Sequence, residues 1–465
     1  MQNEFDLAVI GAGPGGYVAA IRGAQSGMKV ALIEEREIGG TCLNRGCVPT
    51  KALMHSANLY RQISRSDLFG IEATDLKYDM EKIYSRKDEV VSKLRSGVEF
   101  LISANQIEII RSRGLVTDQN TIKTKDREIK AKNILIATGS SPARPPIPGL
   151  DLPGVMTSDE LLNQQQGPGC QSLIIIGGGV IGMEFAGIFS SFGCKVTVIE
   201  AMDRILSTMD REIAQNLSMI MRRRGVTINT RARVNKIEQT EEGLICHYTQ
   251  KETSKVAEAQ AVLVAIGRKP NVDGLFSENL NIKTERGIVV NEHFQTNIPG
   301  IYAIGDVISD GIQLAHLASA QGITAVSHMI GNPSPVDLNT IPSCIYTEPE
   351  IASVGLSADQ AKAQGLSIKT GKFPMSGNAK SIIEDEDRGF IKLVFDSETE
   401  VILGAQMMCG RATDLISEMS TAIVAKLTLA DLGSVIRPHP TFIEGISEAL
   451  DGTHGKAIHI APRNR

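Results

Sequence analysis

A long repeat constrains the fold of this chain more than any other feature of the sequence. The stretch "DLAVIGAGPGGYVAAIRGAQSGMKVALIEE", from Asp6 to Glu35, has a counterpart in "SLIIIGGGVIGMEFAGIFSSFGCKVTVIE", from Ser172 to Glu200. Each copy consists of an apolar run, a glycine-rich turn, a segment of helical periodicity and a second apolar run that ends in Glu. The repeat predicts two β-α-β units, and therefore an α/β fold with parallel sheets.

The turns of both copies carry glycines at the same spacing: Gly11, Gly13 and Gly16 in the first, and Gly177, Gly179 and Gly182 in the second. In a dinucleotide-binding turn the first Gly permits the tight turn, the second lets the backbone approach a pyrophosphate, and the third lets helix pack on strand. Glu34 and Glu200 lie equally far downstream, where a carboxylate accepts hydrogen bonds from ribose hydroxyls. Glycines that serve only the backbone are the alternative, and two complete copies disfavour it.

Three further features bear on these nucleotide sites. A carboxylate at Glu200 repels a 2′-phosphate and favours NAD, although Arg204 nearby leaves NADP open. The strands "NILIATGS" (133–140) and "AVLVAIGR" (261–268) are expected to close the two domains. In "QTNIPGIYAIGDV", Asp306 follows an apolar strand and a glycine, so it is a candidate to bind a polyol chain; an ordinary Gly-Asp turn is the alternative.

Length and composition exclude several classes of protein. The 465 residues suggest several domains, and a chain with 42% hydrophobic and 22% charged residues is neither disordered nor collagenous. A net charge of −5 argues against a nucleic-acid-binding protein. The first residues lack the basic start of a signal peptide, and the apolar run 173–192 contains several glycines and Glu184, so no membrane insertion is expected.

Seven cysteines are scattered along the chain, and two of them, Cys42 and Cys47, are separated by four residues in "GGTCLNRGCVPTK" (39–51). The others occur singly, which disfavours a metal site, and a reducing cytosol, the expected compartment, disfavours a structural disulfide. A redox-active dithiol fits best, because a nearby helix N-terminus and Lys51 or Arg45 would favour thiolates. No metal is expected.

His439 lies between Pro438 and Pro440, just before an apolar segment of helical periodicity. This stiff, extended backbone suits a side chain that must be held in one orientation. A lone histidine, however, is more often structural than catalytic. Thr441-x-x-Glu444 is the pattern of a helix-capping box, in which the Glu side chain bonds to the backbone of the N-cap residue. The residues by themselves leave that alternative open for Glu444.

These motifs occur in an order that resembles the pyridine nucleotide-disulfide oxidoreductase family over the whole chain. The matching segments are "GAGPGG", "GGTCLNRGCVPTK", "ATGS", "GGGVIGME", "AIGD", "YTEPEIASVG" and "HPTFIEG". The resemblance implies an α/β protein with two Rossmann-like dinucleotide-binding domains, the first for FAD and the second for NAD, plus a central domain and an α+β C-terminal dimerisation domain. The implied boundaries are 1–145 for the first part of the FAD-binding domain, 146–270 for the NAD-binding domain, 271–340 for the central domain that completes the FAD site, and 341–465 for the C-terminal domain.

The resemblance also assigns site residues. Positions matching FAD contacts are Gly11, Gly13, Pro14, Gly15, Gly16, Glu34, Glu35, Thr41, Lys51, Gly114, Ala137, Thr138, Gly139, Asp306, Gln313, Leu314, Ala315 and His316. Positions matching NAD contacts are Gly177, Gly178, Gly179, Val180, Ile181, Gly182, Glu200, Val234 and Gly267. The implied catalytic set is the redox pair Cys42 and Cys47, the base His439 with its orienting carboxylate Glu444, and Lys51 paired with Glu184 beside the flavin.

Among the family's activities, the motifs are most similar to those of enzymes that oxidise dihydrolipoyl groups with NAD in 2-oxo acid dehydrogenase or glycine cleavage complexes. The implied partners are a second copy of the chain, in a homodimer, and the lipoyl-bearing protein of such a complex. An NADPH-dependent disulfide reductase similar to glutathione reductase and a non-catalytic structural flavoprotein subunit are the alternatives. Two segments, "HLASAQG" (316–322) and "FPMSGNAKS" (373–381), depart from the family pattern and are expected to lie outside the redox chemistry.

Overall fold

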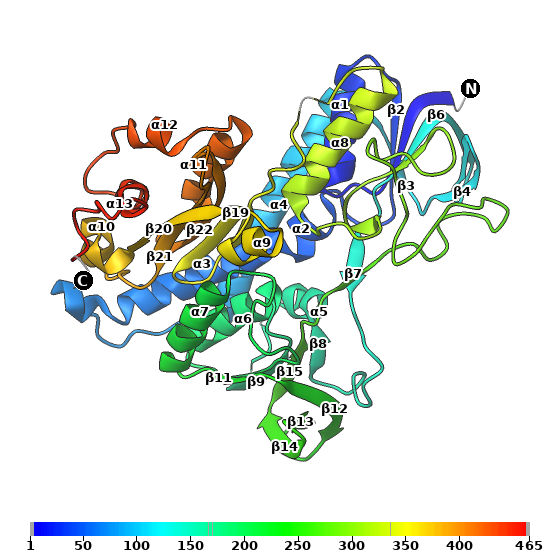
Figure 1. The fold of residues 1–465 in the computed structure, drawn as a ribbon. Coiled ribbons are helices and arrows are strands. Elements are labelled where there is room, and N and C mark those ends of the chain that lie inside the picture. The colour runs from blue at the N-terminus through cyan, green and yellow to red at the C-terminus, as the bar shows by residue number, and fades with distance from the viewer. Residues whose placement is uncertain (1–3, 166, 170, 335, 462–465) are drawn as a thin grey trace. The chain divides into compact units, whose positions relative to one another are not determined.

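A computed structural model describes residues 4–165, 167–169, 171–334 and 336–461 of the chain (Figure 1). It has the mixed α/β architecture that the repeat predicts. The chain divides into two compact units. The first contains Met1–Gln171, Ile237–Leu244 and Ala259–Leu338, and the second contains Ser172–Lys236, Ile245–Glu258 and Asn339–Arg465.

The first unit is organised around a seven-stranded sheet of order β3-β2-β1-β6-β5-β4, in which β17 also pairs with β6. Its strands are β1 (Glu4–Ile10), β2 (Val30–Glu34), β3 (Glu108–Arg111), β4 (Leu115–Asp118), β5 (Thr121–Lys123), β6 (Glu128–Ile136) and β17 (Ile301–Ala303). The neighbours β3, β2, β1, β6 and β17 run parallel, and β4, β5 and β6 are antiparallel. β1 and β2 are almost fully buried, as parallel strands covered on both faces must be.

Helix α1 (Pro14–Gln25) joins β1 to β2 and completes the first predicted β-α-β unit. It begins at Pro14, where the fixed φ of proline suits the first helical position, and its buried face consists of glycine and alanine. Helix α8 (Ala315–Met329) runs beside α1 (Figure 1), and Ser319 Oγ donates to the carbonyl oxygen of Pro14 at 3.2 Å. Small residues on both helices allow this close packing.

The remaining elements of the first unit connect these layers. They are α2 (Gly40–Arg45), α3 (Cys47–Ile63), η1 (Ser66–Phe69), α4 (Met80–Ala104), β7 (Ser140–Pro142), β8 (Val155–Thr157), α5 (Ser158–Asn163), β15 (Ala261–Val264), β16 (Arg268–Pro270) and η2 (Gly305–Val307). β7 pairs antiparallel with β16, and β8 pairs parallel with β15. The strands expected at 133–140 and 261–268 are therefore present, each interrupted by a turn before the short β7 or β16.

The second unit contains the second copy of the repeat. Its parallel strands have the order β11-β10-β9 and include β9 (Ser172–Ile176), β10 (Lys195–Ile199) and β11 (Thr227–Asn229), joined by α6 (Val180–Ser191) and α7 (Arg211–Arg223). The apolar run 173–192 is thus a buried strand, a turn and a helix, as predicted. β12 (Ala232–Gln239), β13 (Leu244–Gln250) and β14 (Thr253–Ala259) form a three-stranded sheet. None of the described helices combines the length and the apolar character that a membrane crossing needs.

The C-terminal part of the second unit is an α+β layer structure. Its antiparallel sheet has the order β18-β19-β22-β21-β20, with β18 (Ser343–Ile345), β19 (Glu350–Gly355), β20 (Ile368–Pro374), β21 (Phe390–Asp396) and β22 (Ile402–Cys409). The helices are α9 (Ala358–Ala363), η3 (Met375–Gly377), α10 (Ala379–Ile383), α11 (Ala412–Val424), α12 (Leu429–Gly433) and α13 (Glu444–Gly452). Buried side chains of α11 and α13, including Met419 and Ile446, share one core with the sheet.

Candidate active site and nucleotide-binding sites

The two glycine turns have nearly the same geometry. Gly13 and Gly179 are both extended and both cap the helix that follows. A Cβ on Gly16 would overlap the carbonyl oxygen of Gly11, and one on Gly182 would overlap that of Gly177. The third glycine is therefore required in both copies for the helix to pack against the turn. Each turn leaves the N-terminus of a twelve-residue helix at the carboxyl end of its sheet, where a pyrophosphate fits.

The carboxylates at the ends of β2 and β10 are also held alike. Glu34 accepts hydrogen bonds from the backbone N–H groups of Ala12, at 2.7 Å, and Arg36, at 2.8 Å. Glu200 accepts from Gly178, at 2.5 Å, and Met202, at 2.6 Å. Backbone donors fix each carboxylate beside its glycine turn, so both sites suit the ribose of a dinucleotide. Arg204 instead donates to the carbonyl oxygen of Ser207 at 2.8 Å.

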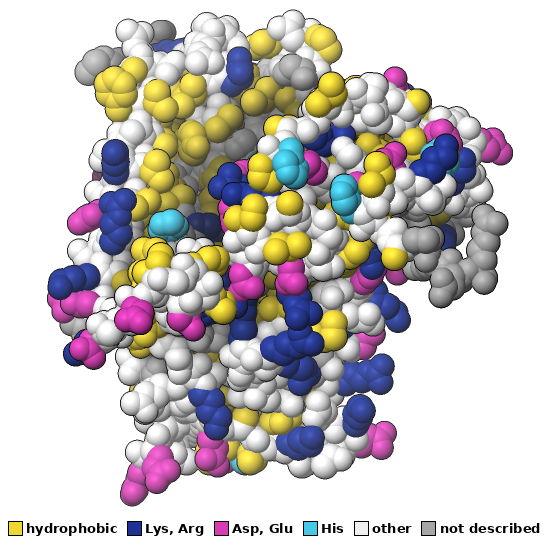
Figure 2. Space-filling view, turned by 90° about the vertical axis from the view of Figure 1, so that its left-hand side faces the viewer, with side chains coloured by type: hydrophobic (Ala, Val, Ile, Leu, Met, Phe, Trp, Pro, Cys, Tyr) yellow, Lys and Arg dark blue, Asp and Glu magenta, His cyan; other side chains and the backbone are white. Residues whose placement is uncertain are grey.

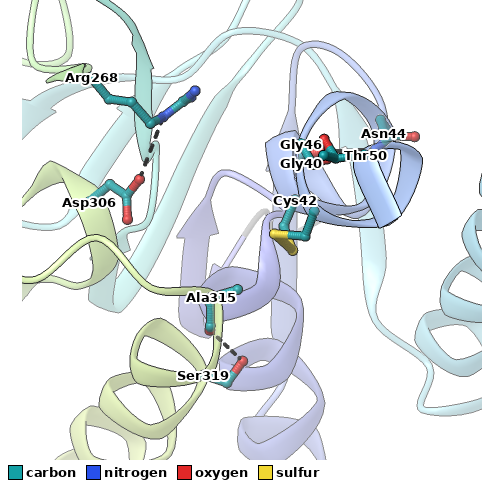
Figure 3. Close-up of a disulfide and its surroundings, with 10 residues drawn as sticks. Gly40, Cys42, Asn44, Gly46, Thr50, Arg268, Asp306, Ala315 and Ser319 are labelled. Atoms are coloured by element: carbon teal, nitrogen blue, oxygen red, sulfur yellow. Dashed lines mark hydrogen bonds and ion pairs between the residues drawn. A yellow bond between two sulfur atoms is a disulfide. The ribbon is translucent and has the colours of Figure 1, made fainter. Parts of the chain in front are cut away.

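Cys42 and Cys47 form a disulfide that joins α2 to the start of α3 (Figure 3). The loop before α2 packs directly on the first glycine turn, because the N–H of Gly39 donates to the carbonyl of Ala12 at 2.8 Å. A Cβ on Gly40 would lie 2.6 Å from the Cα of Gly13. The sequence placed the pair near the first dinucleotide, and the structure brings the two motifs into contact.

Asp306 lies in η2, at the end of β17, close to the carboxyl end of β6. Its carboxylate accepts a hydrogen bond from Ser140 Oγ at 2.6 Å, and Ser140 Oγ accepts from Arg268 Nε at 2.7 Å. Arg268 Nε also lies 4.0 Å from Asp306 Oδ2 (Figure 3). The N–H of Gly305 donates to Gln321 Oε1 of α8 at 2.7 Å. Asp306 is therefore an oriented carboxylate rather than an ordinary turn residue. Ser140, Arg268 and Gln321 were not singled out by the sequence, since none belongs to a recognisable spacing.

An ionic cluster around the buried Arg45 extends from the redox loop. Arg45, between the two cysteines, pairs with Glu37 at 2.7 Å and lies 3.7 Å from Asp159 at the start of α5. Burial raises the pKa of the Asp159 carboxyl and lowers the pKa of the Arg268 guanidinium. Arg45 was noted for its charge, and the structure shows that two carboxylates hold its guanidinium in place.

His439 and Glu444 are brought together at the start of α13. His439 Nδ1 lies 2.9 Å from Glu444 Oε1, while Glu444 Oε2 accepts from the backbone N–H of Thr441 at 2.8 Å. Glu444 therefore makes the backbone bond of the capping pattern and also contacts the imidazole, so the two interpretations are compatible. The Thr441 hydroxyl donates to the Pro438 carbonyl, and α13 begins only at Glu444, so a complete capping box is not formed at this end.

Other predicted residues take positions around these centres. Glu184 is buried in α6, where its carboxylate accepts from the N–H of Tyr346 at 3.1 Å. Lys51 lies one turn after Cys47 in α3; because it belongs to the other unit, its pairing with Glu184 stays a prediction. The remaining positions are distributed as follows: Glu35 follows β2, Thr41 lies in the first turn of α2, Gly114 precedes β4, and Ala137, Thr138 and Gly139 link β6 to β7. Gln313 and Leu314 precede α8, Ala315 and His316 begin it, Val180 and Ile181 begin α6, Val234 is buried in β12, and Gly267 precedes β16.

Within the described residues, no group of three or more His, Cys, Asp or Glu side chains is arranged to hold a metal ion. The oriented carboxylates and the two glycine turns suit a dinucleotide cofactor, and the disulfide suits thiol exchange. Burial also raises the pKa of Cys246 to about 12 and raises that of Cys409, so both thiols stay protonated near neutral pH.

Comparison with known proteins identifies the family. Residues 5–322 match the pyridine nucleotide-disulphide oxidoreductase model, and residues 341–450 match the dimerisation domain of the same family. A dihydrolipoyl dehydrogenase of Bacillus subtilis is 42% identical over 99% of this chain and its own full length. One from Geobacillus stearothermophilus is 38% identical over 98% of both chains.

Solved structures agree with these relatives. LpdA from Mycobacterium tuberculosis superposes with a TM-score of 0.88 at 27% identity, covering 96% of this chain and 98% of that one. The HOCl-induced flavoprotein disulfide reductase RclA of Escherichia coli gives 0.85 at 30% identity, covering 96% of this chain and 99% of that one. FAD and NAD(H) are the cofactors of the family, and the two glycine turns with their oriented carboxylates fit them. The chain belongs to the pyridine nucleotide-disulphide oxidoreductase family.

Proposed function

We propose that this protein is a dihydrolipoyl dehydrogenase, which oxidises protein-bound dihydrolipoyl groups to the lipoyl disulfide and reduces NAD. The observation that carries the proposal is the Cys42–Cys47 disulfide packed against the first dinucleotide turn. The His439–Glu444 pair supplies the base that a thiol substrate needs. The full-length similarity to dihydrolipoyl dehydrogenases supports the same assignment.

The first half of the reaction is a pair of thiol–disulfide exchanges. His439 accepts the proton of one substrate thiol, and Glu444 holds the imidazole through Nδ1 so that Nε2 faces the substrate. The substrate thiolate attacks the sulfur of Cys42, the Cys42–Cys47 bond breaks, and Cys47 leaves as a thiolate. The second substrate thiol then attacks the mixed disulfide, which releases the substrate as a cyclic disulfide and returns a proton to Cys42.

Cys47 suits the role of leaving group because of its position in the fold. It is the first residue of α3, a helix of 17 residues, and the N-terminal backbone groups of a helix stabilise a thiolate. Cys42 is the third residue of α2, a helix of only six residues. The two electrons that the substrate gives up are therefore held by the reduced cysteine pair, with the negative charge on the sulfur of Cys47.

The cofactor sites are assigned to the residues already described. Gly11, Gly13, Gly16, Glu34 and Asp306 would hold FAD, and the second turn with Glu200 would hold NAD. Bound FAD supplies two-electron transfer from the dithiol and hydride transfer to NAD. Lys51 and Glu184 are proposed to pair beside the flavin.

We also propose a homodimer in which His439 of one copy serves the Cys42–Cys47 disulfide of the other. The C-terminal domain carries exposed apolar residues that a second copy would cover, including Ile436, which is 96% exposed, and Ile458, which is 78% exposed. Figure 2 shows hydrophobic side chains gathered on the surface of one face of the molecule. The match to the family's dimerisation domain supports this arrangement.

The proposed substrate is the lipoyl-bearing protein of a 2-oxo acid dehydrogenase or glycine cleavage complex. The proposed location is the cytoplasm.

Anaerobic thiol counting tests the proposal. Dihydrolipoamide added to the flavin-loaded protein should create two new thiols per chain at Cys42 and Cys47, which a maleimide and peptide mapping can identify. NAD added to a parallel sample should then yield NADH. Cys42→Ser should abolish both results, and Cys246→Ala, which removes a buried thiol outside the site, should abolish neither. A protein that dihydrolipoamide leaves oxidised, but NADPH reduces, would instead be a disulfide reductase.

A further inference from the structure

The segment "FPMSGNAKS" (373–381) lies against the loop that carries His439. It contains the end of β20, the short helix η3 and the start of α10. Asn378, the N-cap residue of α10, is 4% exposed. Its amide nitrogen donates to the carbonyl oxygen of Thr441 at 2.9 Å, and its amide oxygen accepts from the N–H of Ser381 at 3.0 Å. Both the oxygen and the nitrogen of this buried amide are therefore hydrogen-bonded, the oxygen within its own segment and the nitrogen to the His439 loop.

Thr441 links Asn378 to the proposed base through consecutive hydrogen bonds. The carbonyl of Thr441 accepts from Asn378, and its N–H donates to Glu444 Oε2 at 2.8 Å. The other oxygen of Glu444 contacts His439 Nδ1 at 2.9 Å. The orientation of the Thr441 backbone thus decides which carboxylate oxygen remains for the imidazole.

The loop is also anchored on the side that precedes His439. The side chain of Arg437 is 3% exposed and pairs with Glu418 of α11 at 2.5 Å. It also donates to Ser447 Oγ of α13 at 3.0 Å. Arg437 and Thr441 therefore fix both ends of a short segment, while the His439 side chain between them is 70% exposed. This arrangement presents an imidazole at the surface from a backbone that cannot shift freely.

We propose that Asn378 is a positioning residue for the His439–Glu444 pair. Its amide holds the Thr441 backbone so that one oxygen of Glu444 is taken by Thr441 and the other is directed to His439. The proposal rests on the proposed function, because it treats His439 as the base of the thiol reaction. A base displaced by about 1 Å can lose on the order of a hundredfold in rate, so small shifts of this loop matter.

Asparagine meets two requirements that few residues meet together. The N-cap position of α10 needs a side-chain acceptor, and Asn, Asp and Ser are all favoured there. The carbonyl of Thr441 needs a donor at the same place, which Asp lacks and the shorter Ser cannot supply over the same distance. Asn378→Ser therefore keeps the cap and removes only the donor to Thr441. Asn378→Asp keeps the cap and the side-chain size, and also removes the donor.

The first test is the rate at which dihydrolipoamide reduces the Cys42–Cys47 disulfide of the flavin-loaded protein, followed by thiol labelling. Asn378→Ser and Asn378→Asp should each lower this rate about tenfold to a hundredfold near neutral pH. The deficit should shrink towards about pH 9, where an ordinary thiol is largely ionised in water and needs no base. A purely structural defect would persist at every pH.

A matched control lies in the same segment. Ser381 is fully buried, and its hydroxyl has no hydrogen-bond partner among the described residues. Ser381→Ala should therefore leave the rate of disulfide reduction unchanged while perturbing the same helix turn. A loss equal to that of Asn378→Ser would show that the segment acts only through its folding, and would overturn the proposal.

A double-mutant cycle separates this proposal from the proposed function. In a His439→Gln background, Asn378→Ser should cause no further loss, because the group that it positions is already gone. If the loss in the double variant equals the sum of the losses in the two single variants, the positioning role is overturned. Failure of dihydrolipoamide to reduce the wild-type disulfide at all would instead remove the proposed function, and this result is distinguishable because it appears before any variant is made.

Discussion

The two dinucleotide folds are built from the same repeat, but one of the positions at which their turns differ has a structural consequence. Gly15 of the first turn corresponds to Ile181 of the second. In the first fold a Cβ at Gly15 would lie 3.0 Å from the carbonyl oxygen of Ala318 and 3.0 Å from Ile304 Cδ1. In the second fold an isoleucine occupies this place. The first turn is therefore covered by α8 and by Ile304, which follows β17, and a side chain at Gly15 would have to displace them, whereas the second turn carries an isoleucine at this place.

The comparison explains how one repeat can serve two cofactors. Helix α8 closes over the first turn and bonds to it through Ser319 and Pro14, and Gln321 holds the N–H of Gly305 beside Asp306. At the second turn Ile181 takes the place of Gly15, while the middle glycines are alike: a Cβ on Gly179 would meet nothing within 4 Å, and one on Gly13 would meet only Gly40 Cα, at 4.0 Å. A covered site suits a cofactor that stays bound, such as FAD, and an open turn suits NAD, which must enter and leave in every cycle.

The largest effect is expected from exchanging the residues that distinguish the folds. Gly15→Ile forces a side chain into the carbonyl of Ala318, so α8 must move, at a cost of about 3 kcal/mol or more. The variant should be purified with little or no flavin. Ile181→Gly, the reciprocal change, should cost about 1 kcal/mol as a helix glycine and retain flavin. Flavin absorbance per protein and urea unfolding measure both, and a flavin-loaded Gly15→Ile would break the comparison.

A second pair of variants tests the matched carboxylates. Glu200→Gln removes the charge that the backbone orients towards a ribose, and should raise the KM for NAD about tenfold without lowering the flavin content. Glu34→Gln should lower the flavin content and leave the KM for NAD unchanged in the protein that remains loaded. Steady-state kinetics and flavin absorbance distinguish the two results. Equal effects of both variants on NAD would mean that the folds have been assigned wrongly.

A smaller effect is expected from α8, the helix that covers the first turn. Gln321→Leu leaves the buried N–H of Gly305 without an acceptor, at a cost of about 1–3 kcal/mol. Flavin release on dilution into urea should therefore occur at a lower urea concentration. Gln321→Glu, which keeps an acceptor oxygen, should behave much more like the wild type. The proposal that α8 retains the flavin fails if Gln321→Leu holds flavin as tightly as Gln321→Glu.

The smallest effect concerns thiol reactivity in the two units. Burial raises the pKa of Cys246 to about 12, so only roughly one in ten thousand of these thiols is ionised at pH 8. After reduction with dihydrolipoamide, a maleimide should label Cys47 in the first unit far faster than Cys246 in the second. Timed labelling and peptide mapping at pH 8 give the two rates. Comparable rates would show that Cys246 is accessible, contrary to its position in β13.

Much of the site follows from local patterns in the sequence. The spacing of Gly11, Gly13 and Gly16, and the distance to Glu34, predicted the turn, the helix and the oriented carboxylate, because all four lie within one β-α-β unit. The same reasoning placed the cysteine pair near the first turn. It missed Asn378, because the segment 373–381 has no pattern that indicates contact with the His439 loop.

By itself, the sequence determined the two β-α-β units and predicted which groups are reactive. The spacing of residues within one segment controls which atoms lie at a turn and at the start of the helix that follows it. Only the tertiary structure decided that α8 covers the first turn, and that Asn378 reaches Thr441 across 63 positions. These contacts join segments far apart in the chain through single atoms, and such contacts leave no periodicity in the sequence.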